Sequence, residues 1–201
     1  MLPPLADIQQ GSSNALAVAL EILFEHSPVL INTLEPQLRD IHLNNKSSHD
    51  HLESYTQLIN YAIAIIMTWD LSTQSQFISG HPRIGENKNL SKLSAKEQGS
   101  SGVIPTSPEV LARLSHLNAC YEIRYPGLRY ITFVNGRTRL EIAEEMEDML
   151  CFPHSLSPDN PPFDTINPVD IASDEWKREL DRAVLDIGRI AKSRLGALGV
   201  I

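Results

Sequence analysis

The residues best suited to chemistry lie in one polar stretch, residues 79–99, which contains His81 and Glu97. His81 begins the sequence His-Pro-Arg-Ile-Gly, and Glu97 belongs to the sequence Ser-Ala-Lys-Glu-Gln. An unperturbed imidazole exchanges its proton near neutral pH, and a carboxylate accepts hydrogen bonds from N–H groups. A stretch this polar inside a chain of ordinary core composition is not expected to fill a core, so its side chains are candidates for binding a ligand.

Both halves of this stretch also have a structural interpretation. A His-Pro pair can be a turn in which the proline fixes the backbone and the imidazole sits at the surface. Ser94-x-x-Glu97 is a ready capping box, in which Ser94 bonds a backbone N–H and Glu97 reaches back to the cap. A glutamate in the first turn of a helix still faces whatever lies in front of that helix, so the two roles are compatible.

The composition limits the kinds of partner. The chain has 201 residues, 42% of them hydrophobic, so it can bury a core of its own, and one domain over residues 1–201 is expected. A formal net charge of -8 argues against nucleic-acid binding. The longest apolar run, residues 61–67, is too short to cross a membrane. We therefore expect a small-molecule partner, no nucleic acid and no membrane.

Cysteine content and the two chain ends indicate the compartment. Cys120 and Cys151 are the only cysteines, so neither a disulfide framework nor a cysteine-rich zinc site can form. The first ten residues lack the pattern of a secretory signal, and the C-terminal Gly-Val-Ile is not a peroxisomal signal of the Ser-Lys-Leu type. The sequence therefore favours a reducing compartment, the cytoplasm or the peroxisome.

Helical periodicity and capping signals cover most of the chain. They predict helices over residues 14–26 (capped by Ser13), 28–35 (capped by Ser27), 51–69, 108–125 (capped by Ser107), from Thr138 onwards, and 173–195. Residues 129–134 are rich in β-branched and aromatic side chains but too short to predict a sheet. We expect an all-α fold, a single compact domain of about seven to nine helices.

One segment between the predicted helices stands apart. Residues 152–168, the proline-rich loop, hold five prolines in seventeen residues. Because proline lacks a backbone N–H and fixes its own φ, such a segment is typical of a surface loop that can be mobile.

The order of motifs along the chain resembles one protein family. The motifs are LFEHSPVL, HPRIG, LSAKEQG, LARLSHLNACYEIRY, FVNGRTRLEI and VLDIGRIAKSRL. Together they resemble the decarboxylases of 2-oxo-4-hydroxy-4-carboxy-5-ureidoimidazoline (OHCU), and the resemblance runs from about Leu5 to Leu198. That family is all-helical, in agreement with the periodicity of this chain.

The resemblance implies a decarboxylase without metal or organic cofactor that converts OHCU to (S)-allantoin in urate degradation. His81 would be the catalytic histidine that handles the proton, and Glu97 would be the carboxylate that binds and orients. The substrate carries its own electron sink, because the bond to the departing carboxylate lies beside a conjugated C=N group. The implied substrate-binding residues are Pro82, Ser94, Gln98, Ile131, Thr132, Phe133, Val134 and Asn135. Family members commonly form homodimers, so a homodimer is implied too.

Asn135 departs from the family pattern, which has an arginine before Gly-Arg. That arginine looks suited to gripping the substrate carboxylate, and asparagine cannot form a charge-assisted fork. Either Arg137 or Arg83 takes over this role, or the substrate differs; Arg83 can equally be a solvated surface charge. The alternative function is a non-catalytic or altered-substrate helical binding module of the same fold.

The remaining histidines and cysteines have weaker claims to a site. His49 and His51 suggest a metal-dependent hydrolase, but no third ligand is evident, so solvated residues are favoured. His26 is expected at a helix C-terminus, His116 on the polar side of its helix and His154 in the proline-rich loop. Cys120 is expected in the core.

Overall fold

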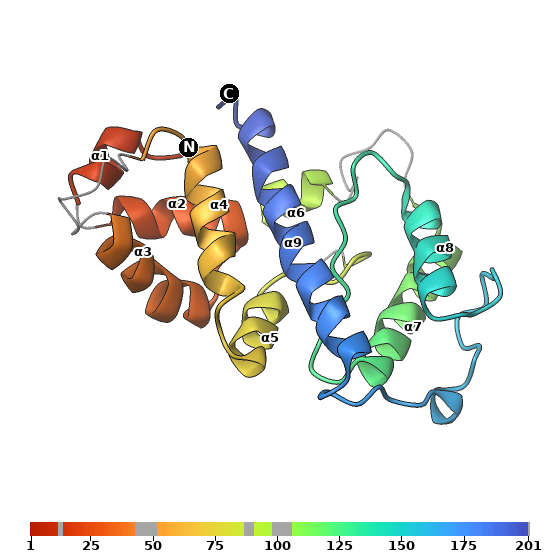
Figure 1. Ribbon diagram of the computed structural model, residues 1–201. Coiled ribbons are helices and arrows are strands. Elements are labelled where there is room, and N and C mark those ends of the chain that lie inside the picture. The colour runs from red at the N-terminus through yellow and green to blue at the C-terminus, as the bar shows by residue number, and fades with distance from the viewer. Residues whose placement is uncertain (12–13, 43–51, 87–90, 98–105, 201) are drawn as a thin grey trace. The chain divides into compact units, whose positions relative to one another are not determined.

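The computed structural model describes residues 1–11, 14–42, 52–86, 91–97 and 106–200. Within these ranges the chain forms nine α-helices, a π-helical turn η1 (Leu30–Leu34), a 3-10 turn η2 (Phe163–Thr165), and no β-strand (Figure 1). The predicted all-α fold is therefore confirmed. Among the described residues no helix is both long and apolar enough to span a membrane.

The chain divides into two compact units. The first consists of residues 1–81 together with residues 181–201, and the second consists of residues 82–180. The final helix, α9 (Asp174–Ala197), begins in the second unit and continues in the first. The expectation of one domain over residues 1–201 stays a prediction.

Short helices build the first unit. They are α1 (Leu5–Gln9), α2 (Ala15–Phe24), α3 (Glu35–His42), α4 (Tyr55–Ile66) and α5 (Leu71–Ser79), joined by η1 and the later part of α9. A Cβ added at Gly188 of α9 would lie 3.0 Å from the side chain of Ile63, so the glycine allows α9 to approach α4 closely. The buried core includes Leu20, Leu23, Ile59, Ala62 and Ile187.

Arg194, near the end of α9, is fully buried in the first unit. Its guanidinium donates to the carbonyl oxygens of Ile22 (3.1 Å) and Leu23 (3.2 Å), which end α2. It also forms an ion pair with Glu25 at 2.6 Å. Because the last carbonyls of a helix lack intrahelical partners, this buried cation satisfies them and fixes α9 to α2.

The helix caps predicted for the first unit agree only in part with the structure. The Ser27 hydroxyl accepts from Leu30 N at 3.2 Å, so the cap before Pro28 is confirmed, but this helical stretch runs on through η1 to the end of α3. The predicted cap Ser13 lies outside the described residues. Helix α4 starts later than predicted, with Ser54 as its cap. Helix α5, capped by Asp70, was not predicted.

The second unit contains three helices of its own and the beginning of α9. They are α6 (Lys92–Glu97), α7 (Pro108–Arg124) and α8 (Arg139–Met149), and α7 and α8 lie side by side (Figure 1). The cap of α7 is confirmed, because the Ser107 hydroxyl accepts from Val110 N. The capping box of α8 is complete, with Thr138 and Glu141 each bonded to the other's backbone N–H.

A buried ion pair between α7 and α8 anchors the proline-rich loop. Arg113 and Glu147 are each 1% exposed, and their charged groups approach to 2.6 Å. Glu147 accepts from the backbone N–H of Ser155 at 3.1 Å. Arg113 donates to the carbonyl oxygens of Ser157, at 2.9 Å, and Asn160. These contacts satisfy both buried charges and hold the loop backbone against the helices.

His116 of α7 provides a second anchor for the same loop. Its Nε2 lies 3.0 Å from the carbonyl oxygen of Pro161, and its ring stacks on Phe163 at a centroid distance of 4.8 Å. The expectation of a polar helix face at His116 is wrong, because the side chain is buried beneath the loop. That burial lowers the pKa of His116.

Candidate functional site

His81 follows Gly80, the residue after α5, and is the last residue of the first unit's N-terminal segment. Its backbone N–H donates to Ile78 O at 3.0 Å, and its imidazole is 3% exposed. The ring meets Phe77 edge-on, with centroids 5.7 Å apart and an interplanar angle of 71°. The interpretation of His81 as a surface-turn histidine is therefore wrong, because the residue is buried and its ring packs against an aromatic neighbour.

Gly80 is required for this placement. A Cβ added at Gly80 would lie 2.8 Å from the Cβ of Ser27, closer than real side chains approach. Ser27 caps the following helical stretch through its bond to Leu30 N. The absence of a side chain at position 80 therefore lets the end of α5, and with it His81, pack against the start of that stretch.

The residues after His81 belong to the second unit and contact α7. Ile84 O accepts from the side-chain amide of Asn118 at 3.0 Å. Arg83 pairs with Glu122 through two bonds, at 2.6 and 3.0 Å. Arg83 is therefore paired with a carboxylate, and its side chain is still 37% exposed.

Ser94 does not cap α6 as the capping-box interpretation required. Ser94 lies within α6, not before it, and is buried. Its backbone N–H donates to the hydroxyl of Ser91 at 3.1 Å. Ser91 is therefore the cap, three residues earlier. Glu97 is the last residue of α6, and its side chain, like the whole of Gln98, lies outside the described residues. The expectation that His81 and Glu97 face one solvent-reachable pocket thus stays a prediction.

The predicted substrate-binding residues 131–135 lie in a stretch to which neither helix nor strand is assigned. Ile131 and Thr132 are buried, while Phe133 and Val134 are half-buried. Side chains of this stretch form hydrogen bonds with α8.

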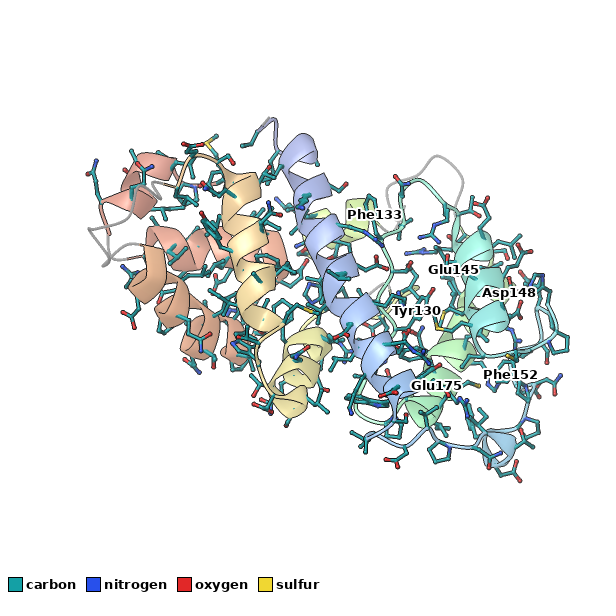
Figure 2. The ribbon with its side chains drawn as sticks, in the orientation of Figure 1. Tyr130, Phe133, Glu145, Asp148, Phe152 and Glu175 are labelled. Atoms are coloured by element: carbon teal, nitrogen blue, oxygen red, sulfur yellow. The ribbon has the colours of Figure 1, made fainter. Side chains whose placement is uncertain are left out.

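Glu145 of α8 accepts hydrogen bonds from side chains of residues 130–132 (Figure 2). Its carboxylate accepts from the Tyr130 hydroxyl at 2.8 Å and from the Thr132 hydroxyl at 3.2 Å. It also forms an ion pair with Arg137. One carboxylate therefore holds three side chains of residues 130–137, and we call these four residues the Glu145 cluster.

Arg137 links the Glu145 cluster to the segment's backbone. Its Nε donates to Val134 O at 3.0 Å, and its Nη2 donates to Phe133 O and to the Thr132 hydroxyl at 3.0 Å. Because a guanidinium presents a planar fork of donors, it can hold successive carbonyl groups in one arrangement. Of the two arginines expected to replace a family arginine, Arg83 is thus paired with Glu122 and Arg137 with Glu145.

Asn135 has a conformational explanation. Asn135 and Gly136 both adopt positive φ, 48° and 79°, and Arg137 N donates to Val134 O at 3.0 Å. Two left-handed central residues closed by this bond make a type I′ turn, for which Asn-Gly is the favoured pair. Asn135 is exposed at the tip of the turn.

The sequence did not predict the roles of three residues near the site, Asn118, Glu122 and Glu145. Their partners lie on other elements, and nothing in the spacing of a helix identifies such a partner. The only available signal was the position of Asn118 and Glu122 within the LNACYE part of a family motif.

The other candidate residues have structural partners. His26 lies 2.7 Å from Glu21, and His154 lies 2.9 Å from Asp148. Cys120 is confirmed in the core, where burial raises the pKa of its thiol to about 11.

A metal site was considered for His49 and His51, which lie outside the described residues. In the described part of the chain, no three His, Cys, Asp or Glu side chains are grouped so as to hold a metal ion.

Comparison with known proteins identifies relatives over most of the chain. The OHCU decarboxylase family model matches residues 9–151, a range that includes His81, Glu97 and the Glu145 cluster. The chain is 24% identical over 189 residues to the "uric acid degradation bifunctional protein PucL" of Bacillus subtilis (strain 168). That match covers 94% of this chain and 31% of the relative, so the chain spans about a third of the relative's length. No solved structure matches significantly. The extent of the family match shows that the chain belongs to the OHCU decarboxylase family.

Proposed function

We propose that this chain decarboxylates OHCU to (S)-allantoin without a cofactor. The observation that carries the proposal is the family match, which spans both the His-Pro motif and the Ser-Ala-Lys-Glu-Gln motif. The name of the Bacillus subtilis relative, which refers to uric acid degradation, agrees with this substrate.

The chemistry requires little beyond placement and one proton. The carbanion left by loss of CO₂ is delocalised into the C=N group of the substrate ring, and a proton must then reach one face of the ring carbon. We assign this proton to His81. The enclosure of its ring beside Phe77 supports the assignment, because a fixed imidazole delivers a proton from one direction.

We assign substrate binding to two further segments that match family motifs, residues 94–98 and residues 131–134. Glu97 would accept from ureido or ring N–H groups, with Ser94 and Gln98 beside it. Pro82 would aim His81, and backbone groups of residues 131–134 would contact the ring. The Glu145 cluster supports the last assignment, since it holds that backbone in one conformation.

The experiment is to generate OHCU in situ from urate and to follow the product by circular dichroism. The uncatalysed reaction gives racemic allantoin, so a growing chiral signal measures catalysis. His81→Ala should lower kcat by about 10²–10⁴-fold, the usual contribution of general acid–base catalysis, with a smaller change in KM. Glu97→Gln should raise KM as well. His26→Ala, which removes an exposed histidine paired with Glu21, is the matched control and should retain full activity.

A second candidate function is binding or turnover of a related substrate. It is favoured by the turn at Asn135 and by the pairing of Arg83 and Arg137 with glutamates, which together differ from a site built around a carboxylate-gripping arginine. Absence of a chiral product, together with binding of a ureidoimidazoline analogue lacking the carboxylate, would favour this alternative.

The implied homodimer is also part of the proposal. Sedimentation equilibrium at micromolar concentration measures the mass in solution, and a monomer mass would contradict the dimer without affecting the assigned chemistry.

A further inference from the structure

A series of contacts connects α9 and α7 to the proposed substrate-binding residues. It leads from Glu179 of α9 through Tyr121 of α7 to Tyr130, the residue directly before Ile131. All four of these residues belong to the second unit. Tyr130 also belongs to the Glu145 cluster, so it is the point at which contacts from three helices meet.

Tyr121 is anchored at its hydroxyl. The residue is fully buried, and its hydroxyl donates to Oε1 of Glu179 at 2.5 Å, a length typical of bonds from a hydroxyl to a carboxylate. Glu179 is itself only 8% exposed. Swinging the Tyr121 ring away would break this bond and take one donor from a buried carboxylate, which costs free energy. The bond therefore fixes the direction in which Tyr121 points.

The ring of Tyr121 meets the ring of Tyr130 edge to face. Their centroids are 5.3 Å apart and their planes are at 78°, close to the perpendicular arrangement that aromatic pairs favour. Tyr130 is 1% exposed, and its hydroxyl donates to Glu145 at 2.8 Å (Figure 2). Tyr130 is therefore held at its ring by α7 and at its hydroxyl by α8.

Tyr130 in turn fixes the start of residues 131–134. Ile131 and Thr132, which follow it, are buried as well. Because a protein interior is close-packed, a large buried ring cannot be displaced without moving the backbone that carries it. Consecutive Cα atoms are only about 3.8 Å apart, so a shift at Tyr130 also moves the backbone of Ile131.

We propose that Tyr121 and Glu179 are positioning residues, which place the substrate-binding residues 131–134 by holding Tyr130. The inference rests on the proposed function, in which backbone groups of residues 131–134 contact the substrate ring. A shift of this backbone weakens contacts that exist in the ground state and in the transition state alike, since the ring is bound in both. Loss of either positioning residue therefore acts on KM and leaves kcat largely unchanged.

The test removes single hydroxyl groups from two tyrosines of α7 in the full chain. Tyr121→Phe removes the bond to Glu179 and keeps the ring. Tyr125→Phe is the matched control, because the Tyr125 hydroxyl also bonds a glutamate of α9, Glu175, at 3.4 Å (Figure 2). Tyr125 is buried too, and its ring lies 5.0 Å from that of Tyr121. Both variants thus remove a tyrosine–glutamate bond between the same two helices.

The first readout is spectroscopic and needs no substrate. The chain has five tyrosines, so ¹³C-labelled tyrosine gives five sets of ring signals, each assigned by its absence from one Tyr→Phe variant. Tyr121→Phe should shift the signals of Tyr130, because a tilted neighbouring ring changes the ring current at Tyr130. Tyr125→Phe should leave the Tyr130 signals in place. Tyr55 and Tyr61, in the first unit, report whether either variant disturbs the whole chain.

The second readout is the division of any activity loss between KM and kcat. Tyr121→Phe should raise KM about 2-fold to 10-fold, the range that one edge-to-face aromatic contact supplies, with kcat within about twofold. Glu179→Leu should act in the same direction, since it removes the acceptor of the Tyr121 hydroxyl. Tyr125→Phe should change neither constant. In a Tyr130→Leu background, Tyr121→Phe should no longer raise KM, because the ring through which it acts is gone.

Four results would overturn the proposal. They are unshifted Tyr130 signals in Tyr121→Phe, an unchanged KM in that variant, an equal rise in KM from Tyr125→Phe, and a Tyr121→Phe effect of full size in the Tyr130→Leu background. If Tyr130→Leu or Glu179→Leu fails to fold, the two Tyr→Phe variants decide. A wild-type chain without decarboxylase activity overturns the proposed function and the expected effect on KM with it, while the tyrosine signals still decide whether Tyr121 holds Tyr130.

Discussion

Two irregular segments of the second unit are each held by one glutamate of α8, at very different depths. Glu147 anchors the proline-rich loop and is 1% exposed, whereas Glu145 anchors residues 130–137 and is 34% exposed. The two glutamates are two positions apart on the helix, so they point to different sides of it. One helix thus carries a buried anchor and a partly solvated anchor.

The two anchors should differ in how much they contribute to stability. The partners of Glu147 are a loop N–H and a fully buried guanidinium, and the guanidinium has no access to water if the carboxylate is lost. The partners of Glu145 are the hydroxyls of two buried residues and a partly exposed guanidinium, and only the guanidinium is accessible to water. We infer that the anchoring of the proline-rich loop contributes more to stability than the anchoring of residues 130–137.

Glu147→Gln should produce the largest effect. Removing one partner of a buried ion pair leaves the other charge uncompensated and costs about 3–5 kcal/mol of unfolding free energy. Urea denaturation measures this loss. Replacing both partners, with Arg113→Met and Glu147→Met, should recover much of the stability. If Glu147→Gln loses no more unfolding free energy than Glu145→Gln, the proposed difference between the two anchors is wrong.

Asn135→Arg should cost about 1–2 kcal/mol, because an ordinary residue is strained in the left-handed conformation that Asn135 adopts. Urea denaturation again gives the value. Asn135→Gly is the control, since glycine adopts positive φ freely, and its stability should match or exceed that of the wild type. Equal losses for the two variants would show that the turn conformation does not explain Asn135.

Glu145→Gln should cost less than about 1 kcal/mol, as expected for a partly exposed ion pair. The amide oxygen can still accept from Tyr130 and Thr132, so only the charge on Arg137 loses its partner in the Glu145 cluster. If residues 131–134 bind substrate, KM should rise by up to about fivefold while the unfolding free energy barely changes. A large stability loss with unchanged KM would place Glu145 in the same class as Glu147.

His116 should give the smallest effect, visible only in acid. Burial lowers the pKa of His116 in the folded state, so the unfolded chain binds the proton more readily. This contribution to stability is complete above the unfolded value of about 6.5 and is lost as pH falls from there to the folded pKa.

The charge of Arg113 also lowers the pKa of His116, and Asp159 opposes it. His116→Gln should therefore remove part of the stability loss between pH 7 and pH 5, measured as the change in urea midpoint. A wild-type midpoint that does not fall faster than that of the variant would contradict this assignment.

Local signals explain what could be predicted from the sequence. The caps at Ser27, Ser107 and Thr138 were found because each acts on a backbone N–H three residues away. The same reasoning failed at Ser94, since Ser91 offers an equal hydroxyl three residues earlier and only the packing of α6 decides between them. Helix α5 was missed because its apolar positions are few, and one of its buried residues is a glutamine, Gln74.

Contacts between distant residues explain what could not be predicted. The motif around His81 located a candidate residue, but not the enclosure of its ring by Phe77. The pairs Arg83–Glu122 and Arg113–Glu147 join residues more than thirty positions apart. A charge on a helix surface has many possible partners at that distance along the chain, so only the fold identifies them.

The burial of Arg194 sets the order in which the protein can be completed during synthesis. Its partners, the carbonyls of Ile22 and Leu23 and the carboxylate of Glu25, leave the ribosome long before it does. Residues 82–180 therefore emerge while the first unit still lacks its last helix. In a nascent chain stalled in this region, the surface of α2 that α9 covers in the finished protein is still exposed. Such incomplete chains are expected to bind chaperones or to be degraded by proteases.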